Sequence, residues 1–71
     1  MPRYYFHVKR GQVTVLDQQG SEFSDISEAV KEAARRAEMI ASKDTLQGIA
    51  ANGRMIIIVD DAWHPVMELP F

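Results

Sequence analysis

The sequence predicts an α+β domain of ββαββ order, in which a four-stranded antiparallel sheet carries one helix on one face. Three observations predict this fold. A segment with helical periodicity lies in the middle of the chain, between two pairs of short segments rich in β-branched or aromatic residues. A few turn-forming residues separate the members of each pair, as in a β-hairpin. A chain of 71 residues accommodates one hydrophobic core, so residues 1–71 are predicted to form a single domain.

The first hairpin begins in the aromatic segment RYYFHVK, residues 3–9. Successive side chains of a strand point to opposite faces. One face therefore carries Tyr4, Phe6 and Val8, and the other carries Tyr5, His7 and Lys9. Residues 10–12 form a short connection to VTVL, residues 13–16, which is rich in β-branched residues and ends at the turn-forming cluster DQQG.

The central segment SDISEAVKEAARRAEMIASK predicts an amphipathic helix. Asp25 is placed to cap the first free amides, and Glu28, three residues later, completes a capping box. Steps of about 100° per residue gather the apolar residues into one stripe. The stripe consists of Ile26, Ala29, Val30, Ala33, Ala37, Ile40 and Ala41. Because most of these side chains are small, the helix can lie close to a sheet of bulky side chains.

The second hairpin follows a connector, GIAANG, in which Gly48 suits a helix C-terminus and Asn52 and Gly53 tolerate positive φ. The segment RMIIIVD, residues 54–60, is apolar on both faces, which is typical of an interior strand. In the last segment, VMELPF, Pro70 and the preceding Pro65 cannot donate to a ladder. They predict an edge strand.

The strand order 2-1-3-4, numbered along the chain, makes every neighbouring pair antiparallel and places strands 3–9 and 54–60 in the centre. One helix covers only one face of such a sheet. A monomer rarely exposes a large apolar patch, so we expect a second copy or another protein to cover the open face. Strand 54–60 presents either Ile56 and Ile58 or Met55, Ile57 and Val59 there, and alternation alone does not decide between them. The predicted interface residues are Tyr5, His7, Leu16, Ile56 and Ile58.

Composition places the chain among folded globular proteins, with 46% hydrophobic and 25% charged residues. The formal net charge of −2 supplies no overall attraction to nucleic acid or to anionic lipid. No apolar stretch is long enough to cross a membrane, and a cytoplasmic location is expected. With no cysteine, the chain has neither disulfides nor thiolate metal ligands. A small core without such links favours self-association as a source of stability.

No residue pattern predicts catalysis, a metal site or a cofactor. His7 and His64 are the only histidines, and no third ligand stands at metal-binding spacing. Adjacent Asp60 and Asp61 are interpreted as turn residues whose side chains bond the nearby backbone. The serines lack a nucleophile motif, and the glycines are too dispersed for a phosphate-binding loop. The aromatic first strand is similar to RNA-stacking strands, but the second helix of an RNA-recognition domain is missing.

The opening MPRYYFHV, the helix EAVKEAARRAE and the closing IVDDAWHPVMELPF resemble a family of short alphaproteobacterial proteins that share a domain of unknown function. The resemblance spans nearly the whole chain. It departs in the last hairpin, where family members carry an acidic residue followed by glycine and this chain has DDAWHP. A weaker likeness connects the chain to the HicB-type antitoxin fold, which also places a hairpin before an alanine-rich helix. Neither resemblance implies an activity, a cofactor or catalytic residues.

Together these observations predict a noncatalytic interaction module that self-associates through the open sheet face. Its expected partner is a second copy or an unidentified protein, and nucleic acid and membranes are not expected. The alternative is a nucleic-acid-associated or antitoxin-like regulator, which would bind nucleic acid with strong salt dependence or co-purify with a toxin.

Overall fold

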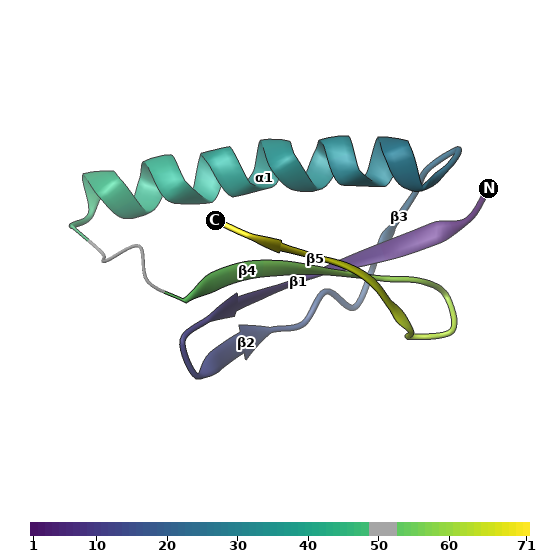
Figure 1. Ribbon diagram of the computed structural model, residues 1–71, viewed down its shortest axis with the longest axis horizontal. Coiled ribbons are helices and arrows are strands. Elements are labelled where there is room, and N and C mark those ends of the chain that lie inside the picture. The colour runs from purple at the N-terminus through teal and green to yellow at the C-terminus, as the bar shows by residue number, and fades with distance from the viewer. Residues whose placement is uncertain (49–52) are drawn as a thin grey trace.

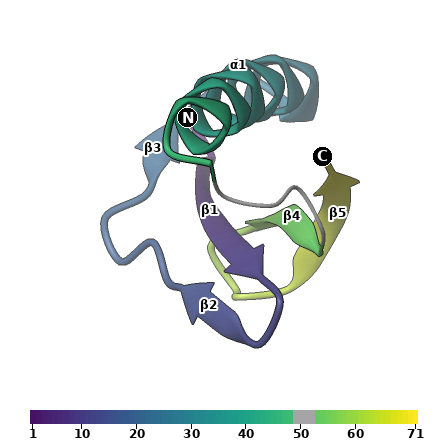
Figure 2. The ribbon, with the colours of Figure 1, turned by 90° about the vertical axis from the view of Figure 1, so that its left-hand side faces the viewer.

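A computed structural model of the chain, which describes residues 1–48 and 53–71, has two layers. Helix α1 (Ile26–Leu46) lies along one face of a twisted antiparallel sheet (Figures 1 and 2). The strands are β1 (Arg3–Arg10), β2 (Val13–Val15), β3 (Ser21–Glu22), β4 (Arg54–Val59) and β5 (Pro65–Pro70). The predicted α+β class is therefore confirmed.

The sheet has the order β2-β1-β4-β5, and all its pairs are antiparallel. This is the order predicted for the four longer strands. The sequence did not indicate β3, whose two residues pair with the start of β1, beside Arg3 and Tyr4. Two residues are too few for an alternating pattern, so β3 is recognised only in the structure, where the chain continues from β2 along the same edge of β1.

The register between β1 and β4 determines which residues form the core. Phe6 is paired with Ile58 and Val8 with Ile56, and all four lie on the helix side. Ile56 and Ile58 are fully buried, with exposed fractions of 0%. Their assignment to the interface is therefore wrong, because the antiparallel pairing places them under α1 and turns their odd-numbered neighbours to the other face.

The alanine stripe of α1 explains how closely the helix approaches the sheet. Ala29, Ala33 and Ala37 are buried against Phe6 and the two core isoleucines. The N-terminus is capped as predicted, because the Asp25 carboxylate accepts a hydrogen bond from the Glu28 N–H at 3.0 Å. The Glu28 side chain does not complete the predicted capping box, because it pairs with Lys31 at 3.4 Å instead. Gly48 follows the last turn at φ +73°, whereas Asn52 lies outside the described residues.

A buried ion-pair cluster joins the C-terminal end of α1 to the sheet. The Asp44 side chain, only 1% exposed, lies 3.1 Å from Arg54 Nη1 and 3.2 Å from Arg10 Nη1. Arg10 and Arg54 are register partners on β1 and β4, so their like charges would repel each other without the carboxylate. Arg54 also donates to the Phe71 carbonyl oxygen at 3.3 Å. The cluster thus connects helix, both central strands and the end of β5.

Candidate interaction surface

The face opposite α1 is assembled by the same register that builds the core. Three cross-strand pairs of β1 and β4 lie on it, and β5 adds Glu68 beside Ile57. The pairs are Tyr5 with Val59, His7 with Ile57, and Lys9 with Met55. We call these residues, together with Trp63 from the β4–β5 turn, the open face. Its centre is aromatic and aliphatic, whereas its two charged side chains, Lys9 and Glu68, are both exposed.

Trp63 covers part of this face. Its ring stacks on Tyr5 at a centroid distance of 4.7 Å and an interplanar angle of 20°. It also stacks on His7 at 5.6 Å and 11°. His7 is consequently buried, with an exposed fraction of 7%, whereas Trp63 itself remains 53% exposed. Val59, the register partner of Tyr5, is also buried, at 4%. The chain therefore covers one end of its own open face with an indole that still presents a surface to solvent.

The hairpin turn holds Trp63 in this position. The Asp60 side chain accepts hydrogen bonds from the Ala62 and His64 N–H groups, and the Asp60 carbonyl accepts one from Trp63. This confirms the interpretation of Asp60 as a turn residue. Trp63 has φ +63°, a left-handed conformation that favours glycine. The stacking on Tyr5 and His7 offsets this strain, which explains how a tryptophan stands at a turn position suited to glycine.

Tyr5 is held on its other side by the loop before β3. Gly20 has φ +69°, and a Cβ atom there would lie 2.8 Å from Tyr5 Cε2. Only glycine combines this backbone conformation with the close approach of the tyrosine ring. The position of Tyr5 on the open face therefore depends on Gly20 as well as on Trp63.

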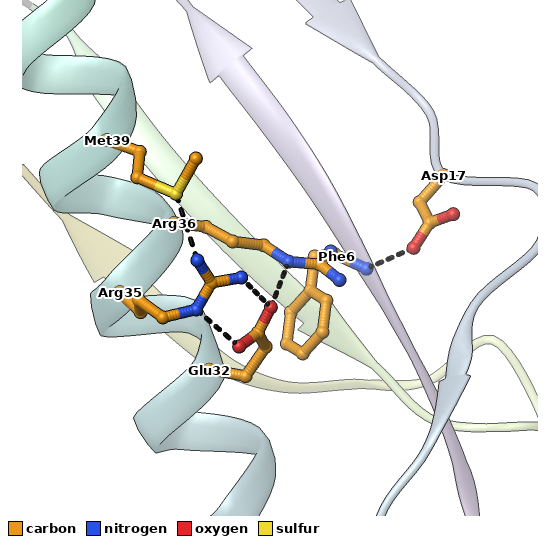
Figure 3. Close-up of polar contacts among 6 residues, drawn as sticks. All are labelled: Phe6, Asp17, Glu32, Arg35, Arg36 and Met39. Atoms are coloured by element: carbon orange, nitrogen blue, oxygen red, sulfur yellow. Dashed lines mark hydrogen bonds and ion pairs between the residues drawn. The ribbon is translucent and has the colours of Figure 1, made fainter.

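Asp17 takes the place of a strand residue beside the middle of β1, in the gap between β2 and β3. Its carboxylate accepts hydrogen bonds from the Phe6, Gln19 and Gly20 N–H groups at 3.0–3.2 Å. Figure 3 shows the first of these bonds. Burial raises the pKa of the Asp17 carboxyl, but these three donors and the charge of Arg36 outweigh burial and hold the pKa below its usual value.

The backbone N–H of Asp17 also makes one ring nitrogen of His7 a hydrogen-bond acceptor. The Asp17 N–H donates to His7 Nδ1 at 3.0 Å, so Nδ1 carries no proton in this geometry. With one nitrogen engaged and the ring stacked against Trp63, His7 acts as a packed strand residue. Acid–base chemistry at Nδ1 would require breaking the bond that closes the middle of the β1 edge.

On the helix side, Glu32 forms ion pairs with Arg35 and Arg36 at 2.7 and 2.8 Å (Figure 3). Hydrogen bonds from Arg35 are the main cause that lowers the pKa of Glu32, and with Arg36 they bring it to about 2 against a rise from burial. The Arg36 guanidinium lies 4.4 Å from the centre of the Phe6 ring. This cluster therefore closes the core at one side of the helix and does not contribute to the open face.

The structure separates the predicted site residues into three groups. Tyr5 and His7 lie on the open face as predicted, Leu16 is 59% exposed after the end of β2, and the two core isoleucines belong to the other side. Within the described ranges, no three His, Cys, Asp or Glu side chains are grouped to hold a metal ion. The sequence did not predict that Trp63 stacks on Tyr5 and His7, because these contacts form only once β1 and β4 are aligned.

Chemically, this arrangement favours contact with an apolar surface. The polar groups nearest the open face, namely Asp17, Asp60 and Nδ1 of His7, are engaged with backbone N–H groups. What faces solvent is one side of an indole, the half-buried side chains of Tyr5, Met55 and Ile57, and two opposite charges at the margins.

A family model described as "Domain of unknown function (DUF6894)" matches residues 3–71. The chain belongs to this family. The match extends over all six elements of the fold, from the first residue of β1 to the residue after β5. No curated protein and no solved structure matches the chain. Of the part of the chain that the structure describes, no helix is long and apolar enough to cross a membrane.

Proposed function

We propose that this member of the family is a noncatalytic interaction module that associates with a second copy of itself through the open face. The observation that carries the proposal is the apolar centre of that face, formed by the half-buried Met55 and Ile57 and the half-exposed Trp63 on the side that α1 does not cover. Burial of this surface by a partner would remove apolar area from water, which is the dominant gain in protein association.

The distribution of charge favours a second copy as the partner. Lys9 lies on β1 and Glu68 on β5, on opposite sides of the Met55–Ile57 centre. In a two-fold contact, each surface meets an identical one, so Lys9 of one copy can face Glu68 of the other. A small domain without disulfides also gains stability from such an association.

The test is the solution mass of the chain, measured by light scattering over a wide concentration range. We expect a mass of two chains or more, where one chain weighs 8.0 kDa. Ile57→Lys places a charge at the centre of the open face and should lower the mass. Leu46→Lys is the matched control, because Leu46 lies on α1 and is 87% exposed. It should leave the mass unchanged.

Two results would contradict the proposal. One is a monomer at all concentrations, and the other is an Ile57→Lys variant that folds and associates like the control. Circular dichroism verifies folding of both variants. Salt-dependent binding of the monomer to nucleic acid would support the alternative, a nucleic-acid-associated regulator.

A further inference from the structure

The two edges of the sheet differ in their protection against further strands. β5 begins at Pro65, ends at Pro70 and carries the exposed Glu68, and prolines and charges of this kind hinder pairing with another chain. At the other edge, β2 and its neighbours form the segment QVTVL, residues 12–16, which contains no charge and no proline. Its apolar side chains are 59–63% exposed. The β2 edge is thus the one open to strand addition.

The backbone of β2 is oriented for such an addition. The two-residue loop of Gly11 and Gln12 connects Arg10 to its register partner Val13, and the residues that close a loop of this length exchange hydrogen bonds. In an antiparallel ladder, the next pair, Lys9 and Thr14, is not hydrogen-bonded. The N–H and C=O groups of Thr14 therefore point away from β1, toward the free edge.

We propose that β2 pairs with β2 of a second copy, antiparallel and about a two-fold axis at Thr14, so that two sheets become one. This segment is complementary to itself. About that axis, Thr14 faces Thr14, and Val13 of each copy faces Val15 of the other. Valine and threonine pairs are favourable cross-strand neighbours, and a two-fold contact uses the same surface twice.

The side chains of β2 also favour this pairing. Val13 and Val15 lie on the helix side, as the register partners of Arg10 and Val8, but α1 leaves them exposed. The pairing sets two valines of each copy against two of the other and removes them from water. Because β2 has only three residues, the ladder between the two copies has few hydrogen bonds, and burial of the valines has to add to the stability of the contact.

This contact is separate from the open face and does not depend on it. Each is a two-fold contact on a different part of the chain. A chain that uses both assembles beyond a dimer, whereas a chain that has lost one of them stops at two copies.

The first test blocks the edge. Thr14→Pro removes the outward N–H of Thr14, and Thr14→Val is the matched control that retains it. By light scattering, the wild-type mass should exceed two chains at high concentration, Thr14→Pro should fall to two, and Thr14→Pro combined with Ile57→Lys should fall to one. If Thr14→Pro alone yields a monomer, the edge contact stands and the open-face proposal fails. If Thr14→Pro folds and has the wild-type mass, the edge contact is refuted.

The second test retains the backbone and detects the axis directly. The chain has no cysteine, so Thr14→Cys introduces a single thiol. Directly opposite residues of a hydrogen-bonded pair have Cα atoms about 5.5 Å apart, within the range that a disulfide spans. Under mild oxidation, Thr14→Cys should form a covalent dimer. Thr45→Cys, at the other threonine, which is exposed on α1, should not. Equal cross-linking of the two variants would refute the pairing, as would none at Thr14, the result expected if a foreign peptide occupies the edge.

Discussion

At the scale of single residues, two side chains make contacts that regular secondary structure does not supply. Asp17 supplies a carboxylate where β1 would otherwise meet a neighbouring strand, and Trp63 accepts a strained backbone to place its ring over Tyr5 and His7. In both cases the stability rests on one residue, so single substitutions should have large effects.

Asp17→Asn should destabilise the fold by roughly 1–3 kcal/mol. The carboxylate uses both of its oxygens to accept from three N–H groups, whereas the amide has only one acceptor oxygen and would turn its NH₂ group toward at least one of these donors. Chemical denaturation measures the loss. Asp61→Asn, at an exposed turn residue, should cost far less and serves as the control. Equal losses in the two variants would show that the Asp17 bonds contribute little.

The same carboxylate predicts a pH dependence. The pKa of folded Asp17 lies below its usual value of 3.8. Its contribution to stability is therefore fully present above that value and disappears as the pH falls through the folded pKa. The difference in unfolding free energy between wild type and Asp17→Asn should shrink as the pH falls below about 4. A difference that stays constant down to the acid transition would contradict this linkage.

Comparing Trp63→Ala with Trp63→Gly separates the stability gained from ring stacking from the cost of the positive φ at this position. Both variants lose the contacts with Tyr5 and His7, which are worth roughly 0.5–1.5 kcal/mol per aromatic pair. Only the alanine variant retains the cost of positive φ, so it should be less stable than the glycine variant by about 1 kcal/mol. Thermal unfolding followed by circular dichroism compares them. Equal stability would mean that the turn changes its conformation when the indole is removed.

At the scale of elements, the fold depends on how closely α1 approaches the sheet. A stripe of alanines faces Phe6, Ile56 and Ile58, and the Asp44 cluster holds the C-terminal end of the helix against β1 and β4. Small side chains on the helix and large ones on the sheet therefore form a matched pair of surfaces.

Ala33→Leu should destabilise the fold by about 1–3 kcal/mol, because Ala33 is fully buried and added methylene groups would push α1 away from β4. Ala34→Leu, one residue further and exposed, makes the same chemical change and should alter stability by less than about 0.5 kcal/mol. Urea denaturation of the two variants is the measurement. A tolerated leucine at position 33 would indicate a looser helix contact than the structure has.

At the scale of the whole molecule, the core is small for an independent domain. Chains of this length have only about 3–5 kcal/mol of net stability from a single core. Association links unfolding to concentration, since a folded oligomer gives more than one unfolded chain. The two contact surfaces, one on the open face and one at the β2 edge, would then supply stability that the monomer lacks.

The midpoint of thermal unfolding should therefore rise with protein concentration, by roughly 3–6 °C for each tenfold increase in the case of a dimer. Differential scanning calorimetry at several concentrations is the measurement, and a combined Thr14→Pro and Ile57→Lys variant is the control whose midpoint should not change. A wild-type midpoint independent of concentration would show that the chain is stable as a monomer.

The helix, the four longer strands and the two faces of β1 follow from the sequence alone. Alternation in RYYFHVK separates Phe6 from Tyr5 and His7, Asp25 marks the helix start, and the two prolines mark the edge strand, all as the structure has them. These signals are local, because period, capping and proline chemistry act within a few residues.

The features that only the tertiary structure decided depend on residues that are distant in the sequence. The segment IIIV is apolar on both faces, so only its pairing with β1 determines that Ile56 and Ile58 lie under α1 and Ile57 on the open face. Likewise, Asp17 meets Phe6 and Trp63 meets Tyr5 only after the strands are aligned. Side-chain period determines which residues share a face, but the register between strands distant in sequence determines what that face meets.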